Sequence, residues 1–160
     1  MFALTKKTDY AIIALAHMAQ RPGVICNARE IAERFHVPLA LMIKVLKVLS
    51  QGELVRSIRG VKGGYTLAMP ADRITLAAII ATIEGPVRFV QCAGSPEPHE
   101  SACELLEVCP VTRTVRKVHE KLKGFLNQVT LADIAYDRDY GNGRVPVSVE
   151  GHEVRRESVL

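Results

Sequence analysis

The sequence lacks the features of membrane and secreted proteins. No uninterrupted apolar run approaches the roughly 18 residues that span a bilayer. The first nine residues lack the basic, apolar and cleavage regions of a signal peptide. Hydrophobic residues make up 48% of the 160-residue chain, which is too many for a disordered protein. We therefore expect a cytoplasmic protein with one packed core and no membrane partner.

The marks of an enzyme are also missing. The chain has no phosphate-binding loop and no convincing pairing of a nucleophile with a base, and it is too short to add a substrate domain. It has no internal repeat and no low-complexity segment. We expect a protein that binds partners, with no catalytic residue and no small-molecule substrate.

Charge is present but unevenly spread. Residues 1–70 hold ten Lys or Arg against four Asp or Glu, a balance of +6. Residues 71–160 hold eleven against thirteen, a balance of −2. A basic first half suggests contact with a polyanion.

The first half carries the pattern of a helix-turn-helix. Apolar periodicity and breaker residues predict helices over about residues 5–20, 27–36 and 38–50. We expect Asn27 to cap the second helix with Glu30 completing a capping box, and Pro38 to occupy the first position of the third. Two helices separated by a tight turn form a helix-turn-helix.

A β-hairpin follows the third helix directly. Residues 54–58 and 65–68 alternate as strands do, and the glycine-rich residues 59–64 turn the chain between them. Such a hairpin beside a helix-turn-helix is a wing. The predicted fold class is mainly α with a small β-hairpin wing.

The second half predicts three more helices and a loop. Thr75 can cap a helix that ends at Gly85, Pro110 opens the longest helix, and Thr130 with Asp133 starts a last short one. The loop between the first two covers residues 91–109. We divide the chain into residues 1–70 as the winged helix-turn-helix DNA-binding region, residues 71–136 as connecting helix, cysteine loop and dimerisation helix, and residues 137–160 as a disordered tail.

The longest helix carries a heptad seam. Its apolar residues are spaced 4, 3, 4, 3 and 4 apart, at Val111, Val115, Val118, Leu122, Phe125 and Val129. The core of a bundle would also produce this stripe. We favour a dimerisation helix and hence a homodimer, because much of the small core is already accounted for.

These elements predict how double-stranded DNA would be bound. A helix-turn-helix places its second helix in the major groove, and an arginine at a thin wing tip suits the minor groove. The residues expected to touch an operator are Lys6, Lys7, Pro38, Leu39, Lys44, Lys47, Arg59 and Lys62. Residues 39–43 have few polar side chains that could form hydrogen bonds with base edges. Wing contacts and DNA shape should therefore contribute more to sequence recognition.

Three of the four cysteines are clustered. Cys92, Cys103 and Cys109 lack the close pairs of a zinc finger, whereas three thiolates in a loop can hold part of an iron–sulfur cluster. Such clusters normally take four ligands, and the candidates for the last one are Asp9, Glu84, His99, His119 and Cys26. Two alternatives stay open: a metal-free thiol redox switch and a structural zinc loop.

Several motifs together resemble a known family. The wing residues 59–65, the three cysteines and the segments 8–11, 84–87 and 125–131 are similar to the Rrf-two (IscR/NsrR-like) family of winged helix-turn-helix iron–sulfur transcription regulators. The resemblance covers roughly residues 2–136. It implies a homodimeric repressor or activator with a 2Fe–2S or 4Fe–4S cluster near the dimer interface, held by Cys92, Cys103 and Cys109.

The resemblance also bears on the fourth ligand. In the IscR branch a histidine three residues after the last cysteine serves, but here that position is Thr112. In the NsrR branch an aspartate at the start of the first helix serves from the other subunit, and Asp9 matches it. The resemblance therefore favours Asp9 over His99. It implies a regulator that senses cluster status, redox state or nitric oxide.

Overall fold

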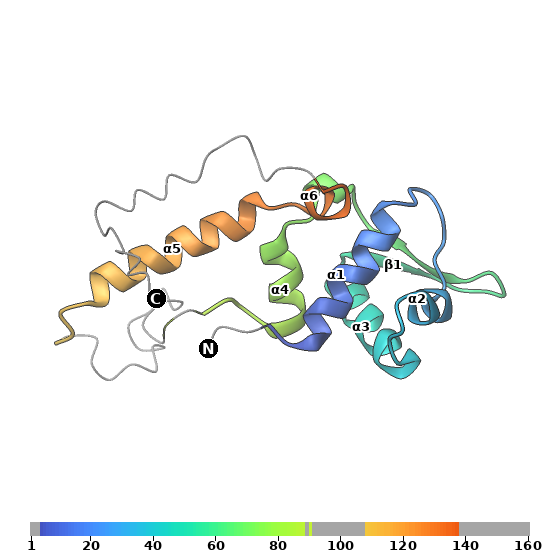
Figure 1. Ribbon diagram of the computed structural model, residues 1–160, viewed down its shortest axis with the longest axis horizontal. Helices are drawn as coiled ribbons and strands as arrows, with labels where there is room; N and C mark the ends of the chain where they lie inside the picture. Colours follow the sequence, from blue (N-terminus) through green and yellow to red (C-terminus); the bar gives the residue numbers. More distant parts are fainter. Residues whose placement is uncertain (1–3, 89, 91–107, 138–160) are drawn as a thin grey trace, which may run out of the picture.

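The structure is a computed structural model that describes residues 4–88, 90 and 108–137. In these ranges it contains six α-helices, one 3-10 helix and a two-stranded sheet (Figure 1). In chain order they are α1 Lys6–Ala19, α2 Ala28–Arg34, α3 Leu39–Gln51, β1 Val55–Ile58, β2 Gly64–Leu67, η1 Ala71–Arg73, α4 Leu76–Glu84, α5 Thr112–Gln128 and α6 Leu131–Ala135. The predicted class, mainly α with a hairpin, is confirmed. No helix in the described ranges is long and apolar enough to cross a bilayer. The predicted disordered tail lies, apart from residue 137, outside the described residues.

Helix α1 forms the centre of the core. It packs against α3, α4 and α6, and its contact face carries Ala11, Ala14 and Leu15, all fully buried. The alanines let neighbouring helices approach closely, and larger side chains such as Leu46 and Leu131 fill the space around them. Burying an aliphatic side chain of this size stabilises the fold by about 1.5–3 kcal/mol.

The helix-turn-helix is present, with a shifted start for its second helix. Asn27 caps α2 by accepting a hydrogen bond from the Arg29 amide, as expected, while the Glu30 carboxylate pairs with Arg21. Pro38 was predicted at the first helical position, and this was wrong by one residue. Its ψ of 124° is extended, so Pro38 is the N-cap and α3 begins at the next residue.

The hairpin is joined to the rest of the fold by a backbone bridge. Strands β1 and β2 are antiparallel, with Ile58 paired to Gly64. Tyr65 exchanges two backbone hydrogen bonds of 2.9 Å with Cys26, ahead of α2. A Cβ on Gly64 would lie 2.5 Å from the Cys26 carbonyl oxygen, so only glycine fits this crossing.

Helices α4, α5 and α6 meet at one corner. The Leu76 amide donates to the Val129 carbonyl at 2.8 Å, and the Leu131 amide donates to the Ile74 carbonyl at 2.7 Å. The predicted capping box of Thr130 with Asp133 is confirmed.

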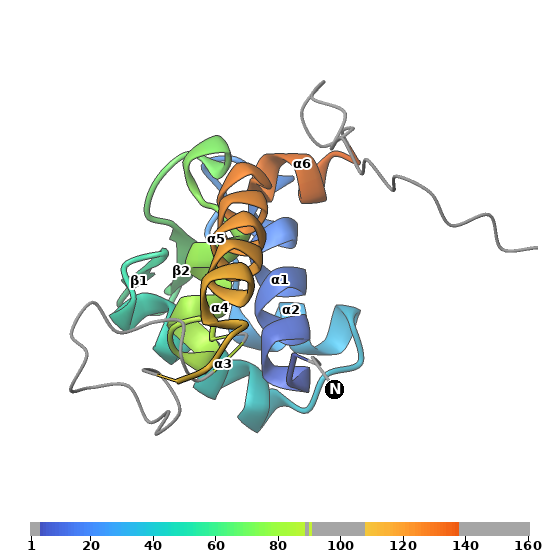
Figure 2. The same ribbon diagram turned by 90° about the vertical axis from the view of Figure 1, so that its left-hand side faces the viewer.

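Helix α5 projects from this corner. In Figure 1 its far end and the hairpin tip lie at opposite ends of the long axis. Seen from the α5 end, α5 overlies α4, with the hairpin and α1 on opposite sides (Figure 2). The prediction that Pro110 opens this helix was wrong by two residues. Val111 is the N-cap and accepts the first helical hydrogen bond, from the Val115 amide.

Candidate nucleic-acid interface and thiol site

Helix α3 presents a mixed small, apolar and basic outer face. Met42, Val45, Leu46 and Leu49 are buried, because they recur on the side that faces the core. The exposed side carries Ala40, Ile43, Lys44, Lys47 and Gln51. Of the two predicted contacts at its start, Pro38 is exposed and Leu39 is partly buried against the core.

Three of the predicted lysines line one groove. Lys7 comes from α1, and Lys44 and Lys47 come from α3. The groove has a volume of about 370 Å³, and its apolar walls come from α3 and from Ile83 at the end of α4. Lysine ammonium groups over an apolar floor suit a sugar–phosphate strand. Lys6, also on the first turn of α1, is exposed but does not line this groove.

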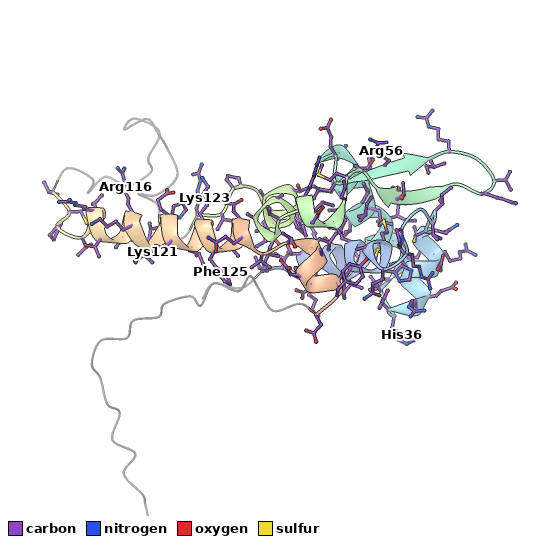
Figure 3. All side chains as sticks on the ribbon, turned by 90° about the horizontal axis from the view of Figure 1, so that it is seen from above. His36, Arg56, Arg116, Lys121, Lys123 and Phe125 are labelled. Carbon is purple, nitrogen blue, oxygen red and sulfur yellow. The ribbon has the colours of Figure 1, made fainter. Side chains whose placement is uncertain are left out.

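The wing carries further exposed basic side chains. Arg59 and Lys62 flank Val61 in the turn, and all three are exposed. Arg56 also points to solvent from β1, at the opposite end of the molecule from Arg116 (Figure 3). Sequence reasoning passed over Arg56, although the alternation from buried Val55 would have placed it outward. Ile43 was passed over as well, and it is 46% exposed in the middle of α3.

The first turn of α1 is bound by Glu84, the last residue of α4. One carboxylate oxygen of Glu84 accepts hydrogen bonds from the Thr5 hydroxyl at 2.5 Å, the Thr8 hydroxyl at 2.5 Å and the Thr5 amide at 3.1 Å. The Thr5 hydroxyl, followed by the Thr8 hydroxyl, lowers the pKa of Glu84. Glu84 is therefore engaged within its own subunit, whereas Asp9, on the same turn of α1, is exposed.

Cys109 sits just before the N-terminus of α5 and is partly exposed. The hydroxyl of Thr112, followed by the backbone amides of Val111 and Thr112, lowers the pKa of Cys109. The Thr112 hydroxyl is buried and has no hydrogen-bond partner other than the Cys109 sulfur among the described residues. Amides at a helix start favour the thiolate, the form that binds metals and reacts. This end of the loop therefore fits a thiolate-bound cluster. Cys92, Cys103 and His99 lie outside the described residues.

The remaining ligand candidates have other surroundings. Cys26 is fully buried, and burial raises the pKa of its thiol. His119 is 4% exposed and faces α4, and its Nδ1 has no hydrogen-bond partner in the described ranges. It lies seven residues beyond Thr112 on α5, or roughly 10 Å along the axis, too far to share a cluster with Cys109. Over the parts of the chain that are described, no three His, Cys, Asp or Glu side chains gather as a metal site.

The heptad seam of α5 divides into two stripes. Val111, Val118 and Phe125, spaced seven apart, are exposed by 54%, 46% and 40%. Val115 and Leu122 are partly buried, and Val129 is buried. Packing in the core explains only the stripe of Val115, Leu122 and Val129. The exposed stripe has no intramolecular partner among the described residues.

Comparison with known proteins agrees with this architecture. A family model described as "Rrf2: Iron-dependent Transcriptional regulator" matches residues 4–137. A protein of Synechocystis described as a candidate HTH-type transcriptional regulator is 35% identical over 136 residues, covering 84% of this chain and 88% of that protein. The HTH-type transcriptional regulator IscR of Serratia proteamaculans is 30% identical over 138 residues, covering 85% and 80%. The crystallised CymR of Bacillus subtilis, described as the global cysteine regulator, superposes with a TM-score of 0.67 at 26% identity, covering 87% of this chain and all of that one.

Proposed function

The chain belongs to the Rrf2 family of transcriptional regulators, and on that premise we propose that it binds operator DNA as a homodimer under the control of its cysteine loop. Its relatives are named as regulators, so it is not an enzyme. The observation that carries DNA binding is the groove shared by Lys7 of α1 with Lys44 and Lys47 of α3.

In this proposal α3 enters the major groove. Lys44 and Lys47 hold a phosphate strand together with Lys7, and the exposed Ile43 meets base edges. Arg59 and Lys62 reach the adjacent minor groove from the wing tip. A fluorescence anisotropy titration over a range of salt concentrations tests this, because each lost phosphate contact lowers the slope of log K against log salt by about 0.9.

The homodimer rests on the exposed stripe of α5. Val111, Val118 and Phe125 continue along nearly four turns of a helix that projects from the body. Apolar positions seven apart that lack a partner among the described residues of their own subunit suit a second copy of the same helix. Sedimentation of the full chain tests this, and a monomer at micromolar concentration would refute it.

The cysteine loop is the proposed sensor. Cys92, Cys103 and Cys109 would hold a 2Fe–2S or 4Fe–4S cluster, with Asp9 of the second subunit completing the ligands. A bound cluster supplies a group whose loss or redox change can be read by the protein. The support from this chain is the lowered pKa of the Cys109 thiol beside the start of α5, together with the exposed side chain of Asp9.

A metal-free thiol switch is the second candidate. The same lowered pKa of Cys109 suits a reactive thiol, and CymR is described as a cysteine regulator. In that case peroxide would oxidise two loop thiols to one disulfide, releasing two electrons and two protons to the oxidant. Iron and sulfide assays with a visible spectrum on protein purified without oxygen separate the two. Colourless protein that also fails reconstitution and forms a disulfide would favour the switch.

A further inference from the structure

Glu84 connects the end of α4 to the beginning of α1. Its carboxylate accepts from the Thr5 amide and from the hydroxyls of Thr5 and Thr8, and Thr8 is fully buried. Thr5 is the N-cap of α1, but its hydroxyl does not cap its own helix. The Glu84 carboxylate thus occupies the positive end of α1, where negative charge is favoured.

The backbone conformation after Glu84 ends α4 at this contact. Gly85 follows with a φ of +90°, a conformation that strains any residue with a Cβ. Helix α4 therefore ends directly after Glu84, and the Glu84 side chain lies beside the first turn of α1. Among the described residues, the Glu84 contacts are the only side-chain hydrogen bonds that join the first turn of α1 to another element.

The Glu84 contact lies between two segments that carry proposed functional residues. Eight residues after Glu84 the sequence reaches Cys92, the first loop cysteine. On the α1 side, Thr8 stands between Lys7, which lines the groove, and Asp9, the proposed ligand. The hydrogen bonds from Thr5 and Thr8 to Glu84 thus link two segments. One leads from α4 to the cysteine loop, and the other is the first turn of α1, which carries Lys7 and Asp9.

We propose that Glu84 is a positioning residue, which holds the first turn of α1 so that Asp9 is presented correctly to the cluster site of the second subunit. This inference rests on the proposed function, since it requires that the dimer holds a cluster. The competing explanation is that Glu84 only caps α1 and adds stability. The two differ in whether loss of Glu84 changes the ligands of the cluster or only the melting temperature.

The test uses the full chain reconstituted with iron and sulfide without oxygen. Visible circular dichroism and resonance Raman spectra are recorded for wild type, Glu84→Ala, Glu84→Gln, Thr8→Val and Asp9→Ala. Glutamine keeps an oxygen that can accept from both threonines, so it should largely restore the wild-type spectrum. Thr75→Val is the matched control, because it removes the hydroxyl that accepts from the Ala78 amide at the other end of α4.

We expect Glu84→Ala and Asp9→Ala to show the same altered spectrum, with Thr8→Val changed in the same direction. A double variant that combines Glu84→Ala with Asp9→Ala should match Asp9→Ala alone. Thr75→Val should keep the wild-type spectrum despite a lower Tm. A wild-type spectrum for Glu84→Ala, with a fall in Tm like that of Thr75→Val, overturns the inference and leaves the cluster intact. If wild type takes up neither iron nor sulfide after reconstitution, cluster binding itself fails, and this inference falls with it.

Discussion

Nε2 of His17, on α1, lies 3.6 Å from a carboxylate oxygen of Glu30, on α2. The same oxygen pairs with Arg21 at 2.5 Å, and the His17 ring packs edge-on against Phe35. His17 is only 3% exposed, so a buried imidazole joins the central helix to the helix-turn-helix. At 3.6 Å the pair is longer than a hydrogen bond. Glu30 would therefore stabilise the positive charge of a protonated His17 only weakly.

The first prediction is a loss of stability in mild acid. Burial, followed by the nearby Arg21 guanidinium, lowers the pKa of His17. The unfolded chain then binds more protons than the folded one as the pH falls below about 6.5, the ordinary value for histidine. Stability is therefore fully present above that value and declines towards the lowered pKa. Thermal melts between pH 7.5 and pH 5 measure it.

A pair of histidine variants assigns this effect. His17→Gln should flatten the decline in Tm between pH 7 and pH 5. His36→Asn is the control, because His36 is exposed in the turn of the helix-turn-helix with a φ of 53°, which asparagine tolerates. An unchanged pH profile for His17→Gln would assign the decline to other groups.

The second prediction concerns the lysine groove. Lys44→Ala and Lys47→Ala should each weaken DNA binding nearly uniformly across sequences and lower the salt slope by about 1. Lys117→Ala, an exposed lysine on α5, should change neither. Anisotropy titrations at several salt concentrations give both quantities. Equal slopes for all four proteins would remove the groove from the DNA interface.

The third prediction concerns the exposed stripe of α5. Val118→Glu places a charge in the proposed dimer interface, where an uncompensated buried charge costs about 3–5 kcal/mol. The dimer dissociation constant should rise on the order of a hundredfold or more. Lys117→Glu, on another side of the helix, is the charge-matched control. Sedimentation equilibrium separates them, and a Val118→Glu dimer as tight as wild type contradicts the assigned interface.

The fourth prediction compares two glycines. Gly64→Ala should destabilise the fold by about 1–3 kcal/mol, because its Cβ would press on the Cys26 carbonyl and part the wing from its bridge. Gly124 lies on α5, and a Cβ added there would have no neighbour within 4 Å. Gly124→Ala should therefore raise the free energy of unfolding by up to about 1 kcal/mol. Urea unfolding measures both. Equal effects would show that the close approach at Gly64 is unimportant.

Local sequence patterns predicted most elements here. The caps at Asn27, Thr75 and Thr130 all bind amides near the start of their helices, because capping depends on residues two or three positions apart. Proline positions were less reliable: Pro38 and Pro110 both lie before their helices, since proline fixes φ but leaves ψ free.

Contacts between distant segments could not be predicted in this way. Glu84 is 79 residues from Thr5, and the Cys26–Tyr65 bridge joins segments that show no shared pattern. The heptad seam was visible, but its division into a more buried stripe and an exposed stripe depends on how α5 packs against α4. Lys7 was expected at DNA from its charge alone, and only the packing of α1 beside α3 brings it to Lys44 and Lys47.

The most direct test of the account is a retention assay without oxygen on mixed genomic DNA fragments. It compares protein carrying iron and sulfide with the same protein after removal of both by a chelator. We predict that the retained fragments differ between the two states, and that Lys44→Ala with Lys47→Ala loses them in both. Identical retention by loaded and stripped protein would contradict control of DNA binding through the cysteine loop.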